Sequence, residues 1–282
     1  MSKLREQMMM DMDLKGFSDA TKTAYISHIE KFTRFFMKAP EKLGEAEIKQ
    51  YLHHMLTKLN FSQSYNSAAY SALRFIYETT LKRNWDGFKI PRSKKIKKLP
   101  VILSREEVKR IFEVTRNIKH RAIFMTIYGA GLRISEAAML KVVDIDSDRM
   151  QIKIQEGKGK KDRVTLLSKT NLNILRNYWS AFHPQKYLFY GADINKPIAT
   201  RTIQRVFEDA VNRAGITKDV SVHSLRHAFA THLIDAGADV FHIQRLMGHS
   251  SIKTTTVYIH ISQKDSLKLI SPLEITMSDE NE

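Results

Sequence analysis

The segment H223-S-L-R-H-A-F-A-T-H-L-I-D-A236 carries the most informative pattern in the chain, and it indicates a helix that ends before Gly237. His223 and Arg226 are three residues apart and therefore share one helical face. Two hydrogen-bonding cations on one face suit a phosphate, because one can clamp its oxygens while the other clamps or moves a proton. His227 could pair with His223 around a metal, but the Glu of H-E-x-x-H is missing and Arg226 would repel a cation. We therefore expect no metal here and a buried or capping role for His227.

The next segment, 246–258, has the sequence LMGHSSIKTTTVY and contains a helix boundary. Gly248 is suited to end one helix, and Ser250 is suited to cap the next. His249 then lies in the joint, and Tyr258 lies at the end of the following helix. A tyrosine in such a place usually packs, and its phenol is a poor nucleophile because its pKa is about 10. It becomes a credible nucleophile where several cations stabilise the phenolate and an attacked phosphate.

Upstream, the hexapeptide GLRISE at 131–136 predicts a further cation at a helix start. Arg133 follows a pair of glycines, and a guanidinium there can grip a phosphate with two parallel N–H bonds. Glu136 lies one turn later and could hold Arg133 in place or cap the helix. The alternative is a surface ion pair of little energetic value.

Residues 149–167 predict a β-hairpin with a lysine-rich tip, because RMQIKIQ and RVTLL flank the turn EGKGKKD. The glycines allow close approach to another backbone, and Lys158, Lys160 and Lys161 supply mobile cations. A lysine beside a leaving oxygen can act as a general acid. The turn is not a Walker A loop, and the alternative is a solvated basic turn.

The remaining chain is predicted to be helical and to form two domains. Residues 18–82 show helical spacing, with Ser18 as a plausible cap. Ser104 and Glu107 form a capping box that opens a second domain. Further helical patterns occupy 118–129, 170–181, 199–213, 239–247 and 251–258.

The overall charge indicates a polyanionic partner. The chain has 46 Lys and Arg against 30 Asp and Glu, which gives a net charge of +16. Such a field attracts nucleic acid or anionic membrane, but the basic residues are not gathered on one amphipathic helix, so we expect no membrane role. There is no cysteine, which excludes disulfides and thiolate metal sites. With no signal peptide or long apolar run, we expect a cytoplasmic, nucleoid-associated protein.

The most basic stretch, 89–98, has the sequence KIPRSKKIKK and holds no acidic residue. Prolines at 91 and 100 bracket it, so we expect an extended linker. The alternatives are a solvated loop and a strap along a DNA backbone, where each cation can neutralise a phosphate. We favour the strap, with these DNA-binding residues: Lys89, Arg92, Lys94, Lys95, Lys97 and Lys98.

Taken in order, the motifs GLRISE, GKGKKDR, HSLRHAFATHL, LMGHSS and TTTVYIH closely resemble the tyrosine recombinases, the lambda-integrase and Xer-like family. The resemblance spans about residues 101–262 and implies a mainly α fold with a small β-hairpin or sheet. It implies a helical, SAM-like core-binding domain over 1–88 and a basic interdomain linker over 89–100. Residues 101–282 would then form an α+β catalytic domain that ends in a docking segment.

The resemblance also implies a role for each matching residue. Tyr258 would be the nucleophile that forms a 3′-phosphotyrosyl bond, and Lys158 would donate a proton to the leaving 5′-oxygen. Lys160 is the rival for that role, because the turn is rich in lysine. Arg133 and Arg226 would clamp the scissile phosphate, His249 would complete its ligands, and Glu136 would support Arg133. His223 would act as an acid/base or as a phosphate ligand.

The family's chemistry implies site-specific cleavage and rejoining of double-stranded DNA for integration, excision or resolution, with no ATP, metal or other cofactor. It implies a homotetramer on DNA, with an accessory protein or a second recombinase as further partners. Residues 262–275 are suited to dock in cis or in trans. Residues 168–222 are too short for the insertion of integron integrases, and 1–17 are too short for a phage-type arm-binding domain. We therefore expect a mobile-element or Xer-like enzyme. The alternatives are a DNA-binding regulator with a decayed site and a type IB-like topoisomerase activity.

Overall fold

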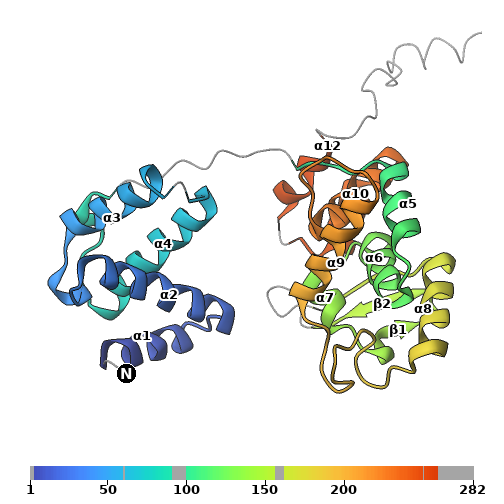
Figure 1. Ribbon diagram of the computed structural model, residues 1–282, viewed down its shortest axis with the longest axis horizontal. Helices are drawn as coiled ribbons and strands as arrows, with labels where there is room; N and C mark the ends of the chain where they lie inside the picture. The colour runs from blue at the N-terminus through green and yellow to red at the C-terminus, as the bar shows by residue number, and fades with distance from the viewer. Residues whose placement is uncertain (1–2, 60, 91–99, 156–161, 250, 260–282) are drawn as a thin grey trace, which may run out of the picture. The chain divides into compact units, whose positions relative to one another are not determined.

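The computed structural model describes residues 3–59, 61–90, 100–155, 162–249 and 251–259. The chain divides into two compact units, Met1–Lys97 and Lys98–Glu282, and each has its own hydrophobic core. The predicted fold class is confirmed, because helices dominate both units and one small sheet lies in the second (Figure 1). None of the helices in the described ranges combines the length and apolar character of a membrane-spanning segment.

The first unit is a helical bundle. Its elements are α1 (Lys3–Leu14), α2 (Asp19–Phe36), a 3₁₀ turn (Pro40–Lys42), α3 (Glu45–Thr57), α4 (Gln63–Phe75), a π turn (Ile76–Thr80) and a 3₁₀ turn (Asp86–Phe88). Ser18 caps α2 by accepting a hydrogen bond from the backbone N–H of Thr21 at 3.3 Å. The helix α1 was not predicted from the sequence; its Met8 and Met12 are four residues apart and both buried.

The second unit surrounds a three-stranded antiparallel sheet in its described part. Its elements are α5 (Arg105–Val114), α6 (Ile118–Ala130), α7 (Ile134–Met139), a 3₁₀ turn (Val142–Asp144), β1 (Ile145–Asp146), β2 (Gln151–Ile154), β3 (Arg163–Leu166), α8 (Lys169–Phe182), α9 (Thr200–Arg213), α10 (Val222–Asp235), α11 (Val240–Met247), a 3₁₀ turn (Ile252–Thr254) and α12 (Thr256–Ile259). The strands lie in the order β1-β2-β3, with Ile152 opposite both Ile145 and Thr165. The hairpin formed by β2 and β3 was predicted, and β1 was not.

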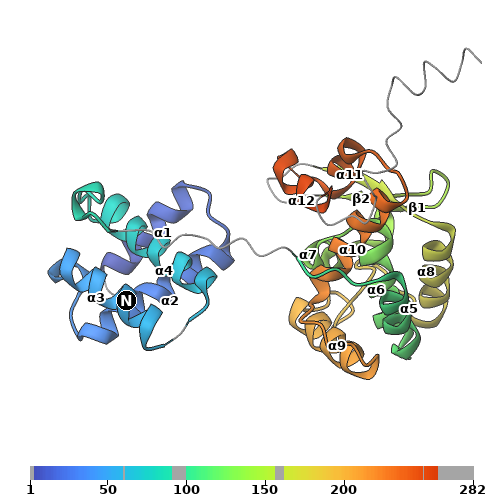
Figure 2. The same cartoon turned by 90° about the horizontal axis from the view of Figure 1, so that it is seen from above.

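The core of the second unit forms around α6, which packs against α8 and α10. Ile123, Phe124 and Ile127 on α6 are buried within it. The helix α11 contacts β3, while α10 contacts both α11 and α12. Figure 2 shows α10, α11 and α12 next to one another. This packing brings four parts of the unit together, namely the start of α7, the start of β3, one face of α10 and the joint between α11 and α12.

Two local details refine the sequence predictions. Ser104 and Glu107 form both bonds of the predicted capping box, at 2.7 and 3.1 Å. The predicted single helix over 251–258 is wrong, because a 3₁₀ turn ends at Thr254 and α12 starts at Thr256. Three consecutive β-branched threonines lower the helix propensity at this break.

Candidate active site

The sequence around Arg133 places its side chain at the junction of two helices. The helix α6 ends at Ala130, and Gly131 caps it with φ +63°, a backbone conformation that favours glycine. A Cβ at Gly131 would lie 2.5 Å from two ring atoms of Phe229, so α6 and α10 pack too closely here for any larger residue. Arg133 then serves as the N-cap residue of α7. The predicted position of Arg133 at a helix start is thus observed.

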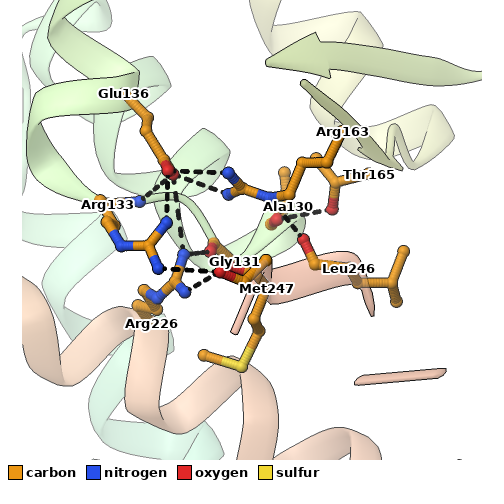
Figure 3. Close-up of polar contacts among 10 residues, drawn as sticks. Ala130, Gly131, Arg133, Glu136, Arg163, Thr165, Arg226, Leu246 and Met247 are labelled. Atoms are coloured by element: carbon orange, nitrogen blue, oxygen red, sulfur yellow. Dashed lines mark hydrogen bonds and ion pairs between the residues drawn. The ribbon is translucent and has the colours of Figure 1, made fainter. Parts of the chain in front are cut away.

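Glu136 holds this junction together, as Figure 3 shows. One of its oxygens accepts a hydrogen bond from the Arg133 guanidinium at 2.6 Å, and the other accepts from the Arg133 backbone N–H at 2.7 Å. Arg163 binds both oxygens through a bidentate pair at 2.7 Å each. Arg226 adds an ion pair at 3.7 Å. We call Arg133, Arg163, Arg226 and Glu136 the arginine cage.

Burial alone would raise the pKa of Glu136, but the hydrogen bonds from Arg163 and Arg133 outweigh it and lower the pKa to about 2. The carboxylate therefore stays ionised at neutral pH. One negative charge faces three guanidiniums, so the arginine cage keeps an excess of positive charge. Such an excess in a shielded place is suited to bind an anion.

Arg226 is the most deeply buried member of the arginine cage, with 1% of its surface exposed. Its two terminal nitrogens donate to the backbone carbonyls of Gly131 and Met247, the latter at 2.6 Å. Burial and the neighbouring Arg133 lower the pKa of Arg226. The two carbonyls fix the plane of the guanidinium, which has five N–H donors in all. Arg226 thereby ties the end of α6 to the end of α11.

Arg163 follows the lysine-rich turn, and no role was predicted for it from the sequence. In addition to the Glu136 pair, its Nε donates to the carbonyl of Leu246 at 2.8 Å. Gly248 lies against it, since a Cβ there would be 2.7 Å from the Arg163 side chain. The only local signal was an arginine directly after the lysine turn. Its partner Glu136 is 27 residues away in sequence, so the contact depends on the tertiary fold.

His249 lies in the α11–α12 joint, as predicted from Gly248. Its backbone N–H donates to the carbonyl of Gln244 at 3.1 Å, and its Nδ1 bonds the Thr255 hydroxyl at 2.8 Å. Burial, followed by the charges of Arg226 and Arg133, lowers the pKa of His249 to about 4. The imidazole is therefore neutral at pH 7.

Tyr258 lies beside the arginine cage on α12, and 3% of its surface is exposed. Its hydroxyl forms a 2.8 Å hydrogen bond with His227 Nδ1. Burial raises the pKa of the phenol, while Arg226 and Arg133 act in the opposite direction. The ring of His249 stacks near Tyr258 at an interplanar angle of 16° and a centroid distance of 6.5 Å. His227, expected only to be buried or capping, is thus partly buried and bonded to the tyrosine.

The other predicted site residues fall into two groups. His223 is exposed on α10, and its ring meets that of His227 edge to face at 4.7 Å. Lys89 is exposed after the 3₁₀ turn at 86–88. The rest lie outside the described residues, namely Lys158, Lys160, Arg92, Lys94, Lys95, Lys97 and Lys98.

A cavity of about 620 Å³ opens beside Arg133 and Glu136, and Lys141 and Lys153 also line it. It adds two cations to the surroundings of the arginine cage. Across the part of the chain that the structure describes, no three His, Asp or Glu side chains are grouped as metal ligands. The arrangement as a whole is a positively charged site that is suited to bind an anion, with a buried tyrosine next to it.

The fold, this site and the family comparisons identify the class of protein, which is that of the site-specific DNA recombinases called tyrosine recombinases. The chain belongs to the phage integrase family, whose model matches residues 102–265. A second model, the phage integrase N-terminal SAM-like domain, matches residues 4–87.

Relatives resemble the chain along most of its length. A Sinorhizobium fredii protein assigned to the integrase/recombinases is 41% identical over 276 residues, which cover 98% of this chain and 90% of the relative. An integrase/recombinase of Escherichia coli is 31% identical over 315 aligned positions, covering 96% and 93%. The crystal structure of XerA recombinase matches with a TM-score of 0.54 at 27% identity, covering 99% and 98%. Lambda integrase, bound to a core site, matches in fold with a TM-score of 0.74 at 17% identity, covering 93% and 96%.

Proposed function

We propose that the chain cuts and rejoins DNA strands through a covalent bond between the Tyr258 hydroxyl oxygen and the 3′ phosphate at the break. The observation that carries this proposal is the arginine cage, whose excess positive charge lies beside a buried tyrosine hydroxyl. A phosphodiester placed there would meet guanidiniums suited to its oxygens. The same cations favour the phenolate, which is otherwise scarce at neutral pH.

Each cation has a proposed task in this reaction. Arg133, whose side chain is 20% exposed, and Arg226, whose plane is fixed by two carbonyls, would clamp the attacked phosphate. His223 and His249 would complete its ligands. Lys158 would protonate the leaving 5′-oxygen, with Lys160 as its rival on the same turn.

The proposed partner is duplex DNA, bound by a homotetramer in the cytoplasm. The net charge of +16 supports a polyanionic partner. Structures of XerH with difH substrate and of the Tn1549 integrase with circular intermediate DNA show those proteins on DNA. We propose that residues 1–88 bind the core site, that the basic segment 89–100 follows the DNA backbone, and that residues 262–275 of the catalytic domain dock on a protein surface.

The test uses nicked duplexes taken from the DNA that flanks the coding sequence, because a nick traps the covalent intermediate. Wild-type protein and Tyr258→Phe are incubated with these duplexes without added metal, and the products are run on a denaturing gel. A protein–DNA adduct with wild type alone is the expected result. An absence of adduct with both proteins, on DNA that both bind, would point to a DNA-binding regulator or to a missing partner protein. Relaxation of supercoiled DNA that needs no paired site would instead identify a type IB-like topoisomerase.

A further inference from the structure

The Tyr258 hydroxyl has one described side-chain partner, and it is outside the set of phosphate ligands. His227 Nδ1 lies 2.8 Å from the hydroxyl oxygen, and the two ring centroids are 5.6 Å apart. The pair joins α10 to α12, two elements that pack directly on each other. The contact therefore places an imidazole nitrogen within hydrogen-bond distance of the oxygen that would attack the phosphate.

We propose that His227 is a catalytic residue that holds the Tyr258 hydroxyl and takes up its proton as the tyrosine attacks. The inference rests on the proposed function, because it assumes that Tyr258 is the nucleophile. Proton transfer needs a donor and an acceptor within hydrogen-bond reach, and 2.8 Å meets that condition before substrate arrives. The proposal thus gives the tyrosine a base of its own.

The surroundings of His227 keep its imidazole neutral. Burial, followed by the neighbouring His223 and Arg226, lowers the pKa of His227 to about 4, so the ring is uncharged at pH 7. The proposal requires the tautomer with its proton on Nε2, in which Nδ1 accepts the hydrogen bond that the phenol donates. Burial raises the pKa of Tyr258, and the charges of Arg226 and Arg133 act to lower it. A phosphate bound to the arginine cage would offset these positive neighbours, which makes the imidazole a stronger base during the reaction.

The other two histidines of the site are less suited to this task. The Nδ1 of His249 is bonded to the Thr255 hydroxyl, and its ring stacks with the tyrosine ring instead of pointing at the hydroxyl. His223 is exposed and presents its ring to His227. These two groups are better placed to act on the phosphate than on the phenol.

The proposed step balances in atoms and charge. The Tyr258 O–H bond breaks and its proton passes to His227 Nδ1, while a new bond forms between the tyrosine oxygen and phosphorus. The bond from phosphorus to the 5′-oxygen breaks, and that oxygen takes a separate proton from the general acid, proposed as Lys158. In the rejoining step each transfer reverses, so His227 returns the proton to the tyrosine.

The chain offers a matched control on the same helix. His232 Nδ1 bonds the hydroxyl of Tyr128 at 2.9 Å, which reproduces the chemistry of the His227–Tyr258 pair away from the arginine cage. An asparagine at either position can still accept the phenol's hydrogen bond, but it cannot accept a proton. His227→Asn and His232→Asn each remove the imidazole from one His–Tyr pair, and only His227→Asn does so at Tyr258.

The experiment measures single-turnover adduct formation on the trapping duplex, after circular dichroism and gel shift show that each variant folds and binds. We expect His227→Asn to be slower by about 10²-fold or more, the usual contribution of a general base, and His232→Asn to match wild type. A ring-fluorinated tyrosine at position 258 ionises more readily, so it should restore His227→Asn far more than it speeds wild type.

Two results would overturn the proposal. One is a His227→Asn protein that forms adduct at nearly the wild-type rate. The other is a slow His227→Asn protein that gains nothing from the fluorinated tyrosine, since a purely structural loss would not respond to phenol acidity. Failure of the proposed function is distinguishable, because wild type would then form no adduct or Tyr258→Phe would form one, and both proposals would fall together.

Discussion

Replacing Glu136 by glutamine removes one charge from the arginine cage and leaves the shape of the side chain almost unchanged. The Glu136 side chain is 6% exposed and pairs with Arg133 at 2.6 Å, Arg163 at 2.7 Å and Arg226 at 3.7 Å. Removing one partner of a buried ion pair costs about 3–5 kcal/mol, because the remaining charges stay buried without compensation. Three guanidiniums would be left facing one another, so we expect a loss in this range.

The pKa of Glu136 gives an independent magnitude. It is lowered from 4.5 to about 2, and each unit corresponds to about 1.4 kcal/mol, so ionised Glu136 stabilises the fold by roughly 3 kcal/mol. The folded state favours the carboxylate, so this contribution is present above pH 4.5 and is lost as the pH falls towards 2. At about 2–4 °C per kcal/mol for a unit of this size, Glu136→Gln should lower Tm by roughly 6–20 °C at pH 7.

Calorimetry of the full chain at pH 7 and at lower pH values measures both effects. The control is Glu113→Gln, because Glu113 is 60% exposed and pairs with Lys109 at 3.8 Å. Such a surface pair contributes little, so the control should stay within about 0.5 kcal/mol of wild type. The gap between wild type and Glu136→Gln should narrow as the pH falls below 4.5. Equal Tm values for wild type and Glu136→Gln at pH 7 would refute the assigned role of this carboxylate.

Three further substitutions test other parts of the site. Gly131→Ala should lower the free energy of unfolding in urea titrations by more than 2 kcal/mol, and Gly215→Ala by about 1 kcal/mol. Both glycines have positive φ, but only at Gly131 would the added Cβ lie 2.5 Å from an aromatic ring. Equal losses would contradict a steric role for Gly131. Arg163→Lys keeps the charge but loses the bidentate geometry, so we expect about 2 kcal/mol less stability and slower adduct formation, and unchanged values for both would remove Arg163 from the site. Because the pKa of His249 is lowered in the folded state, the unfolded state binds more protons between about pH 4 and 6.5, and stability rises with pH across this window. His249→Asn should make stability less dependent on pH there. A pH dependence identical to wild type would show that His249 does not cause the rise.

Local signals in the sequence were sufficient to predict most elements of the fold. The Ser104–Glu107 capping box, the α6 stop at Gly131 and the hairpin all depend on residues that are close in sequence. The helix α1 was not predicted, because the sequence before residue 18 was considered only as a possible signal peptide. Its Met8 and Met12 are four residues apart and share the buried face.

The candidate site was only partly predictable. Motif order placed Arg133, Arg226, His249 and Tyr258 in one site, and the structure brings these four together. Neither the Arg163 contact with Glu136 nor the hydrogen bond between Tyr258 and His227, which spans 31 residues, has a local pattern. The first pair joins β3 to α7 and the second joins α10 to α12, so both depend on the tertiary fold and neither has a signal in the local sequence.

The four-residue α12 carries Tyr258, and it follows every other described element of the catalytic unit. Because so short a helix does not form alone, α12 depends on packing against α10. On the ribosome, the three guanidiniums and the carboxylate that balances them are therefore synthesised before Tyr258. Under the proposed function, a chain that ends before Tyr258 would carry these cations but could not form a covalent bond to DNA.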